Sequence, residues 1–189
     1  MVTVIEKSKK IEYGDFQTPK ELADEVCQKL VELGVSPEYV IEPTCGLGVF
    51  LESATEKFSN VKKFVGVEVN SEYYSELKTA SKNFSEPEKI DIREGDFFKF
   101  DWQRLLKETG GEILILGNFP WVTNATQGAI GGLNLPQKTN FQNLNGLDAL
   151  TGKSNFDISE FMLIKVSEWF LHRTGHLAML VKTSVARKF

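Results

Sequence analysis

Short apolar runs alternate with helical patterns along this chain, and that alternation limits its possible folds more than any other feature. The apolar runs lie at 39–42, 64–69, 90–98, 112–116 and 176–181. The helical patterns lie at 19–33, 49–58, 71–84 and 156–173. Strands that alternate with helices predict an α/β fold with a doubly wound, mostly parallel sheet. Ligands of such sheets bind beyond the carboxyl ends of the strands.

Two of the expected helices begin with a pattern typical of a capping box. In the first, Thr18 precedes Pro19, and Glu21 follows three residues after Thr18. In the last, Asp157 is followed by Glu160 in the same register. A side-chain oxygen at the cap and a glutamate three residues later satisfy N–H groups that the first turn leaves free. We therefore predict that Thr18 and Asp157 cap helices.

Length and composition indicate one soluble domain over 1–189. No apolar run approaches the roughly 18–20 residues of a membrane helix, and the start lacks the apolar stretch of a secretory signal. We expect a cytoplasmic location. Cys27 and Cys45 follow no metal-ligand spacing, so no metal is expected. The net charge of −4 argues against nucleic-acid binding over the whole surface, but not against a basic patch or a binding partner.

A glycine-containing loop follows the first apolar run. It consists of Glu42-Pro43-Thr44-Cys45-Gly46-Leu47-Gly48 and leads into a helix. Glycine lets the backbone turn tightly and lets a ligand approach closely. Glu68 ends the second apolar run, where an acid can accept hydrogen bonds from ribose hydroxyls. The combination predicts a nucleoside site, and a tight turn with a solvated Glu68 is the purely structural alternative.

The loop does not match the common phosphate-binding motifs. A pyrophosphate motif would place a third glycine where Leu51 stands, and a P-loop would need Gly-Lys-Ser/Thr. The carboxylate of Glu42 would repel phosphate, but it would suit a ligand that carries an ammonium group. S-adenosylmethionine has an adenosine, an ammonium and a sulfonium, and it has no phosphate. We therefore predict S-adenosylmethionine as the cofactor.

Motifs in a fixed order give the chain a family resemblance. They are Phe16-Gln17-Thr18-Pro19, Glu42 to Gly48, Glu68, Asp96-Phe97 and Asn118-Phe119-Pro120-Trp121. In this order they resemble the gamma-class methyltransferases that modify the N6 amine of adenine in DNA, as in restriction-modification systems. The resemblance covers nearly the whole chain. It implies a Rossmann-like class I methyltransferase fold and a cofactor site at the carboxyl ends of the first three strands.

The resemblance also implies which residues hold the cofactor. The set is Phe16, Thr18, Glu42, Pro43, Cys45, Gly46, Gly48, Glu68, Asp96 and Phe97. Within this set, Thr18 would touch the methionine end of the cofactor and Glu42 would face its ammonium group. Glu68 would face the ribose, and Asp96 with Phe97 would face the adenine. A loop cap and a core phenylalanine are the structural alternative for Asp96 and Phe97.

The catalytic residues implied by the resemblance are Asn118, Phe119, Pro120 and Trp121. The side-chain carbonyl of Asn118 and the backbone carbonyl of Phe119 would accept the two N–H protons of the target amine. This localises the lone pair on the nitrogen, which is otherwise delocalised into the ring. Trp121 would stack on a base flipped out of the duplex, a contact worth about 1–3 kcal/mol. The alternative is a turn that buries Trp121 in the core.

Phe119 departs from the family, which usually has proline at this position. Phenylalanine adds an N–H and frees φ, so we expect a looser turn and impaired catalysis. A Phe119→Pro variant would then be faster. Other functions also stay open, namely methylation of RNA bases or of a protein glutamine amide, and a non-catalytic cofactor-binding subunit.

The expected partner of the chain is DNA. In the gamma class a target-recognition domain follows the catalytic part, and here little follows the fifth apolar run. We therefore expect the chain to be incomplete at its C-terminus and to lack that domain. Segment 123–156 is rich in Asn and Gly and nearly free of charge. Long loops inside compact domains are usually functional, so we expect this one to be mobile and to order over the target strand.

Overall fold

The computed structural model describes residues 17–121 and 158–188, which belong to two compact units. Residues 17–119 and 164–181 form the first, here called the sheet unit. The described part of the second unit consists of 120–121, 158–163 and 182–188. The expected loop at 123–156, the expected cap Asp157 and the predicted cofactor contact Phe16 lie outside the described residues.

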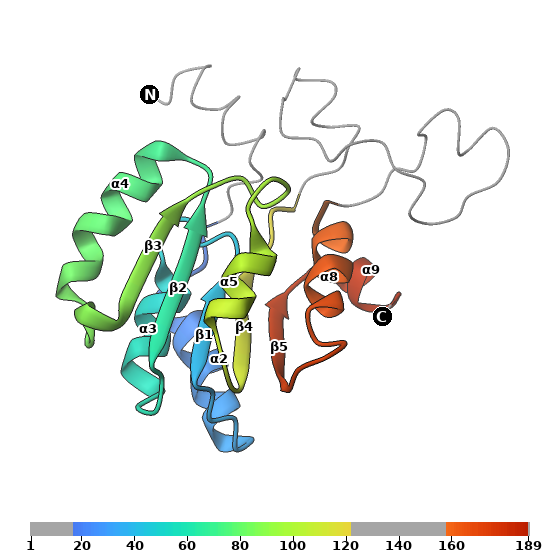
Figure 1. The fold of residues 1–189 in the computed structure, drawn as a ribbon, viewed down its shortest axis with the longest axis horizontal. Coiled ribbons are helices and arrows are strands. Elements are labelled where there is room, and N and C mark those ends of the chain that lie inside the picture. The colour runs from blue at the N-terminus through green and yellow to red at the C-terminus, as the bar shows by residue number, and fades with distance from the viewer. Residues whose placement is uncertain (1–16, 122–157, 189) are drawn as a thin grey trace, which may run out of the picture. The chain divides into compact units, whose positions relative to one another are not determined.

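The sheet unit contains a five-stranded parallel sheet in the order β3-β2-β1-β4-β5 (Figure 1). Its strands are β1 (Tyr39–Glu42), β2 (Lys63–Glu68), β3 (Ile90–Glu94), β4 (Ile113–Asn118) and β5 (Gly175–Leu180). The predicted doubly wound fold is confirmed. Because β1 pairs with both β2 and β4, the order of the strands reverses beside β1. Such a switch point is where open α/β sheets bind ligands, beyond the carboxyl ends of the strands.

The helices are as follows: α2 (Lys20–Glu32), α3 (Val49–Lys57), α4 (Ser71–Ala80), α5 (Trp102–Glu108), α8 (Ile158–Glu168) and α9 (Thr183–Ala186). Two of them have side-chain caps, since Asn70 accepts N–H groups at the start of α4 and Asp101 accepts one at the start of α5. The sequence patterns do not predict α5 and α9, which are short. No helix in the described ranges is both long and apolar enough to cross a bilayer.

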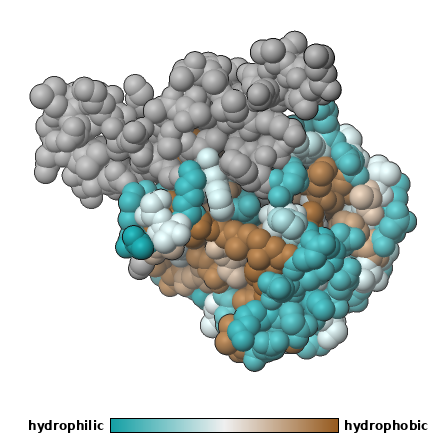
Figure 2. Space-filling view, turned by 180° about the vertical axis from the view of Figure 1, so that it is seen from behind, coloured by the Kyte–Doolittle hydropathy of each residue, from teal (hydrophilic) through white to brown (hydrophobic). Residues whose placement is uncertain are grey.

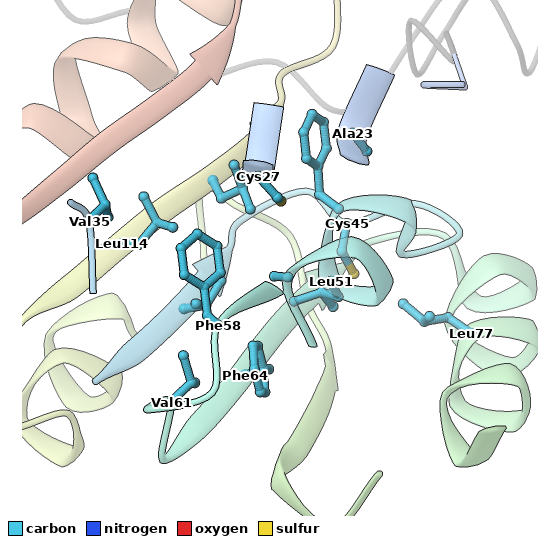
Figure 3. Packing of buried hydrophobic residues seen from close by; sticks show 14 residues of the cluster. Ala23, Cys27, Val35, Cys45, Leu51, Phe58, Val61, Phe64, Leu77 and Leu114 are labelled. Carbon is cyan, nitrogen blue, oxygen red and sulfur yellow. The ribbon is translucent and has the colours of Figure 1, made fainter. Parts of the chain in front are cut away.

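Alternating residues of the strands pack on the two faces of the sheet. Toward α2, α3 and α4, the core contains Phe64 of β2 and Leu114 of β4, which lie among Cys27, Leu51 and Leu77 (Figure 3). The residues between them point to the opposite face, in front of which α5 lies (Figure 1). They are just as buried, and they include Ile41, Val65, Ile113 and Ile115. Some apolar side chains remain at the surface (Figure 2), among them Leu33.

The predicted capping box at Thr18 is wrong. Helix α2 begins at Lys20 and Pro19 occupies the cap position, where, among the described residues, there is no side-chain cap hydrogen bond. Proline at the cap has the extended conformation that leads into a helix, so Thr18 lies one residue too early to act as the cap. Its hydroxyl has another partner, described below.

Candidate functional site

The glycine loop lies at the carboxyl end of β1, as predicted. Gly46 and Gly48 have φ of 53° and 78°, in the left-handed region that other residues seldom adopt. A Cβ atom at Gly48 would overlap the Leu77 side chain of α4. Backbone bonds brace the loop, since the N–H of Cys45 donates to Val67 over 3.0 Å and that of Gly48 donates to Cys45 over 2.7 Å. The turn into α3 therefore requires glycine.

Glu68 lies at the carboxyl end of β2 and holds this loop in place. Its two carboxylate oxygens accept the backbone N–H groups of Gly46 and Asn70, each over 2.7 Å. The side chain is buried, with 7% of the residue exposed. A carboxylate oxygen can accept more than one hydrogen bond, so these bonds leave capacity for ribose hydroxyls. The contact of Glu68 with ribose stays a prediction.

Glu42 ends β1 in a buried position, 3% exposed, beside Pro43, which is also buried. One carboxylate oxygen accepts the N–H of Leu51 over 3.2 Å. Burial raises the pKa of the Glu42 carboxyl well above its ordinary value; the Leu51 hydrogen bond opposes this shift and the charge of Glu68 adds to it. A nearby cation would favour the ionised form of Glu42. The structure thus places a buried acid where the sequence predicts an ammonium site.

Both cysteines are buried in the core and act there as small apolar residues. Burial raises the pKa of the Cys27 thiol to about 12 and that of the Cys45 thiol well above its usual value. Charges of Glu42 and Glu68 push the pKa of Cys45 further in the same direction. A thiol whose pKa is raised by burial is a poor nucleophile, as is typical of cysteines in a core.

Asp96 and Phe97 follow β3 and form a turn. One Asp96 carboxylate oxygen accepts the N–H of Phe98 over 2.9 Å, and the other lies 3.3 Å from the Lys99 ammonium group. Phe97 is buried, 5% exposed, and its carbonyl accepts the indole N–H of Trp102 over 2.7 Å. The structure therefore supports the alternative of a loop cap and a core phenylalanine. Contacts of either residue with adenine stay predictions.

Asn118 is the last residue of β4 and is held at two places. Its side-chain Nδ2 donates to the hydroxyl of Thr18 over 3.3 Å. Its backbone carbonyl accepts the hydroxyl of Thr44, in the glycine loop, over 3.5 Å. Its side-chain Oδ1 is buried and accepts a hydrogen bond from none of the described residues. A buried acceptor without a donor is costly, and such groups concentrate at functional sites.

Phe119 packs into an aromatic cluster made of Phe97, Trp102, Phe119 and Trp169. It is 1% exposed, and its ring lies 5.9 Å from that of Phe97, edge to face. Trp169 stacks on Phe97 at 6.3 Å and lies 4.8 Å from Trp102. The buried ring restrains this residue through packing, whereas proline would restrain φ through its own ring. The expectation of a looser turn stays a prediction.

Pro120 and Trp121 follow in the second unit, where Trp121 is partly buried. Their catalytic roles stay predictions. Three residues of the site were missed in the sequence analysis, namely Thr44, Trp102 and Trp169. Thr44 lies within the glycine loop, but the two tryptophans join the cluster through their contacts with Phe97, and no local sequence pattern indicates those contacts.

Comparison with known proteins supplies a relative of high identity. No family model matches the chain. A type II methyltransferase of Nostoc sp., M.NspV, is 56% identical over 188 residues, which cover 100% of this chain and 39% of the relative. A second, M.CvrRI of Paramecium bursaria Chlorella virus XZ-6E, is 29% identical over 122 residues, 65% of this chain and 28% of the relative. The chain thus spans well under half the length of either relative.

Solved structures share the fold at much lower identity. A protein of Pyrococcus horikoshii, provisionally assigned as an RNA methyltransferase, aligns with a TM-score of 0.57 at 16% identity. The alignment covers 94% of this chain and 68% of that one. At this identity the match establishes the Rossmann-like methyltransferase fold alone.

We expect Glu42→Gln to raise the stability of the cofactor-free protein above about pH 4.5. The pKa of Glu42 is raised in the folded chain, so the unfolded chain releases this proton first. Stability is therefore lost as pH rises from the unfolded pKa through the folded one. The glutamine side chain of the variant keeps an acceptor for the Leu51 N–H and removes the titration. The gain in Tm should be larger at about pH 8 than at about pH 5, and Glu25→Gln, at an exposed site, is the control. A gain independent of pH would contradict this account.

We expect Phe119→Pro to destabilise the protein, contrary to the expectation from sequence that it improves the turn. Removing the ring leaves a cavity beside Phe97, and Phe→Ala changes in cores cost about 3–5 kcal/mol. Phe119→Leu keeps most of the volume and should cost less, at most about 1.5 kcal/mol. Urea unfolding of the two variants and of Phe119→Ala measures this. A Phe119→Pro variant as stable as the wild type would show that the aromatic packing does not hold the turn.

Proposed function

We propose that this chain, which is 56% identical to a type II methyltransferase over 188 residues, transfers a methyl group from S-adenosylmethionine to the N6 amine of adenine in DNA. The observation that carries the proposal is the buried Oδ1 of Asn118, beside the glycine loop, to which none of the described residues donates a hydrogen bond. A catalyst that must accept a hydrogen bond from the N–H of a planar amine needs such an oxygen.

The residues around the loop fit the proposed cofactor in charge and in space. Gly46 leaves room at the surface of the loop, since a Cβ atom there would meet only Gln17 Oε1, at 3.9 Å, within that distance range. Glu42 and Glu68 are buried acids on adjacent strands, and they suit an ammonium group and ribose hydroxyls, respectively. When bound, S-adenosylmethionine supplies a methyl group already activated by the sulfonium.

The protein has to position the amine for in-line attack. Asn118 Oδ1 and the backbone carbonyl of Phe119 accept its two N–H groups, which favours a pyramidal nitrogen with a localised lone pair. Holding two reactants in such a geometry can contribute about 7–11 kcal/mol to lowering the barrier. The base has to leave its stack to reach the site, and Trp121 provides a surface for it.

Affinity for DNA depends largely on phosphate contacts from lysine and arginine. This chain has 22 basic against 26 acidic residues, so its balance is unsuited to wide contact with DNA. The relatives are much longer than the chain. We propose that sequence recognition resides in a domain outside the 189 residues.

We expect Glu68→Ala to weaken cofactor binding about tenfold or more. The change removes the acceptor for ribose and releases the Gly46 N–H that fixes the loop; each such charge-assisted bond is worth about 1.5–3 kcal/mol. Calorimetry with S-adenosylmethionine measures the affinity. Glu76→Ala, at an exposed position of α4, is the matched control. An unchanged affinity in Glu68→Ala would refute the assignment of the cofactor site.

We expect Asn118→Ala to lower kcat about a hundredfold or more and to leave cofactor affinity nearly unchanged. The lost hydrogen bond strengthens in the transition state, so turnover suffers more than binding. Methyl transfer to an adenine-containing duplex is followed with the full-length protein, and the product nucleoside is identified by mass spectrometry. N6-methyladenine from the wild type supports the proposal. Another methylated base, or normal turnover by Asn118→Ala, would overturn it.

A further inference from the structure

We propose that Thr18 is a positioning residue that anchors the side-chain amide of Asn118 so that Oδ1 faces the target amine. The proposal deepens the proposed function and rests on it. The family resemblance assigns Thr18 to the cofactor, and the sequence also predicts it as a helix cap. In the structure it does not cap α2, and its hydroxyl accepts a hydrogen bond from Asn118 Nδ2 over 3.3 Å.

The position of Thr18 follows from how α2 begins. Pro19 takes the cap position in an extended conformation, so the residue before it lies outside the helix. Its hydroxyl therefore makes no capping hydrogen bond to the backbone N–H groups of the first turn of α2. Thr18 is partly buried within the sheet unit, where it meets a residue 100 positions later in the chain. Thr18, just before α2, therefore lies at the carboxyl end of β4.

An asparagine side chain needs such an anchor because its two ends have opposite hydrogen-bonding character. If the amide turned over, Nδ2 would face the target amine and present donors to donors. With Nδ2 on the Thr18 hydroxyl, Oδ1 is the other end of the amide, and none of the described residues donates a hydrogen bond to it. The Thr18 hydroxyl accepts from Nδ2 in this orientation, which leaves Oδ1 to accept the N–H groups of the amine.

A second anchor acts on the backbone of the same residue. The Thr44 hydroxyl donates to the Asn118 carbonyl, and β4 pairs with β5 at this position through Leu180. The main chain of Asn118 is therefore fixed by the loop and the neighbouring strand. Rotation of the side chain remains, and among the described residues only Thr18 makes a side-chain hydrogen bond that limits it. The effect of Thr18 should accordingly be on orientation, and so on kcat.

The decisive comparison is Thr18→Val against Thr18→Ser in the full-length protein. Valine keeps the shape and removes the hydroxyl, while serine keeps the hydroxyl. We expect Thr18→Val to lower kcat about tenfold, as suits the loss of one hydrogen bond. The KM for DNA and the Kd for S-adenosylmethionine should change by less than about twofold, and Thr18→Ser should recover most of kcat. Thr55→Val, which removes a buried hydroxyl bonded to Glu52 in α3, is the control and should leave kcat unchanged.

Two results for Thr18→Val would overturn the proposal. A raised cofactor Kd with unchanged kcat would assign Thr18 to the cofactor. Unchanged kcat and Kd would overturn the proposal as well. If the wild type does not methylate adenine, the proposed function fails, and the anchor is then read by NMR of the side-chain amide of Asn118. Slower amide hydrogen exchange in the wild type and Thr18→Ser than in Thr18→Val supports the anchor, and equal exchange contradicts it.

Discussion

Asn118 and Phe119, at the end of β4, make contacts with different parts of the sheet unit, and these contacts position the proposed site. Asn118 bonds to Thr18, which leads into α2, and to Thr44 in the glycine loop. The next residue, Phe119, packs its ring with Phe97 and the rest of the aromatic cluster, which includes Trp102 of α5. Successive side chains of a strand point to opposite faces, so both anchors can act on two neighbouring residues. The two proposed acceptors, Asn118 Oδ1 and the Phe119 carbonyl, are carried by this doubly anchored backbone.

The acids beside the glycine loop illustrate how the site is maintained at the expense of stability. Glu42 is buried with the N–H of Leu51 as a hydrogen-bond donor, and its pKa is raised by burial. Glu68 has a more favourable position, since each of its oxygens accepts a backbone N–H. Burying a carboxyl group weakens the folded state unless a charge or hydrogen bonds compensate. A cationic ligand, as proposed above, would supply that compensation for Glu42.

Much of the fold was predictable because strands and glycine loops have local signals. All five strands were expected from apolar runs, and β1 was placed with its observed bounds. The roles of Thr18 and Phe119 were not predictable, because both depend on contacts across the fold. Thr18 lies in a sequence pattern that is typical of a helix cap, yet Pro19 occupies the cap position of α2. Phe119 departs from the family's proline, and its packing against Phe97, which in turn stacks on Trp169, is not visible in the sequence around it.

The most direct test of the central claim is a crystal structure of the full-length protein with a non-transferable cofactor analogue and a duplex that contains the target adenine. The account predicts that the N6 amine lies within hydrogen-bond distance, about 2.7–3.2 Å, of both Asn118 Oδ1 and the Phe119 carbonyl. Asn118 Nδ2 should remain on the Thr18 hydroxyl. An amine bound elsewhere, or an Asn118 amide with Nδ2 turned toward the base, would contradict it.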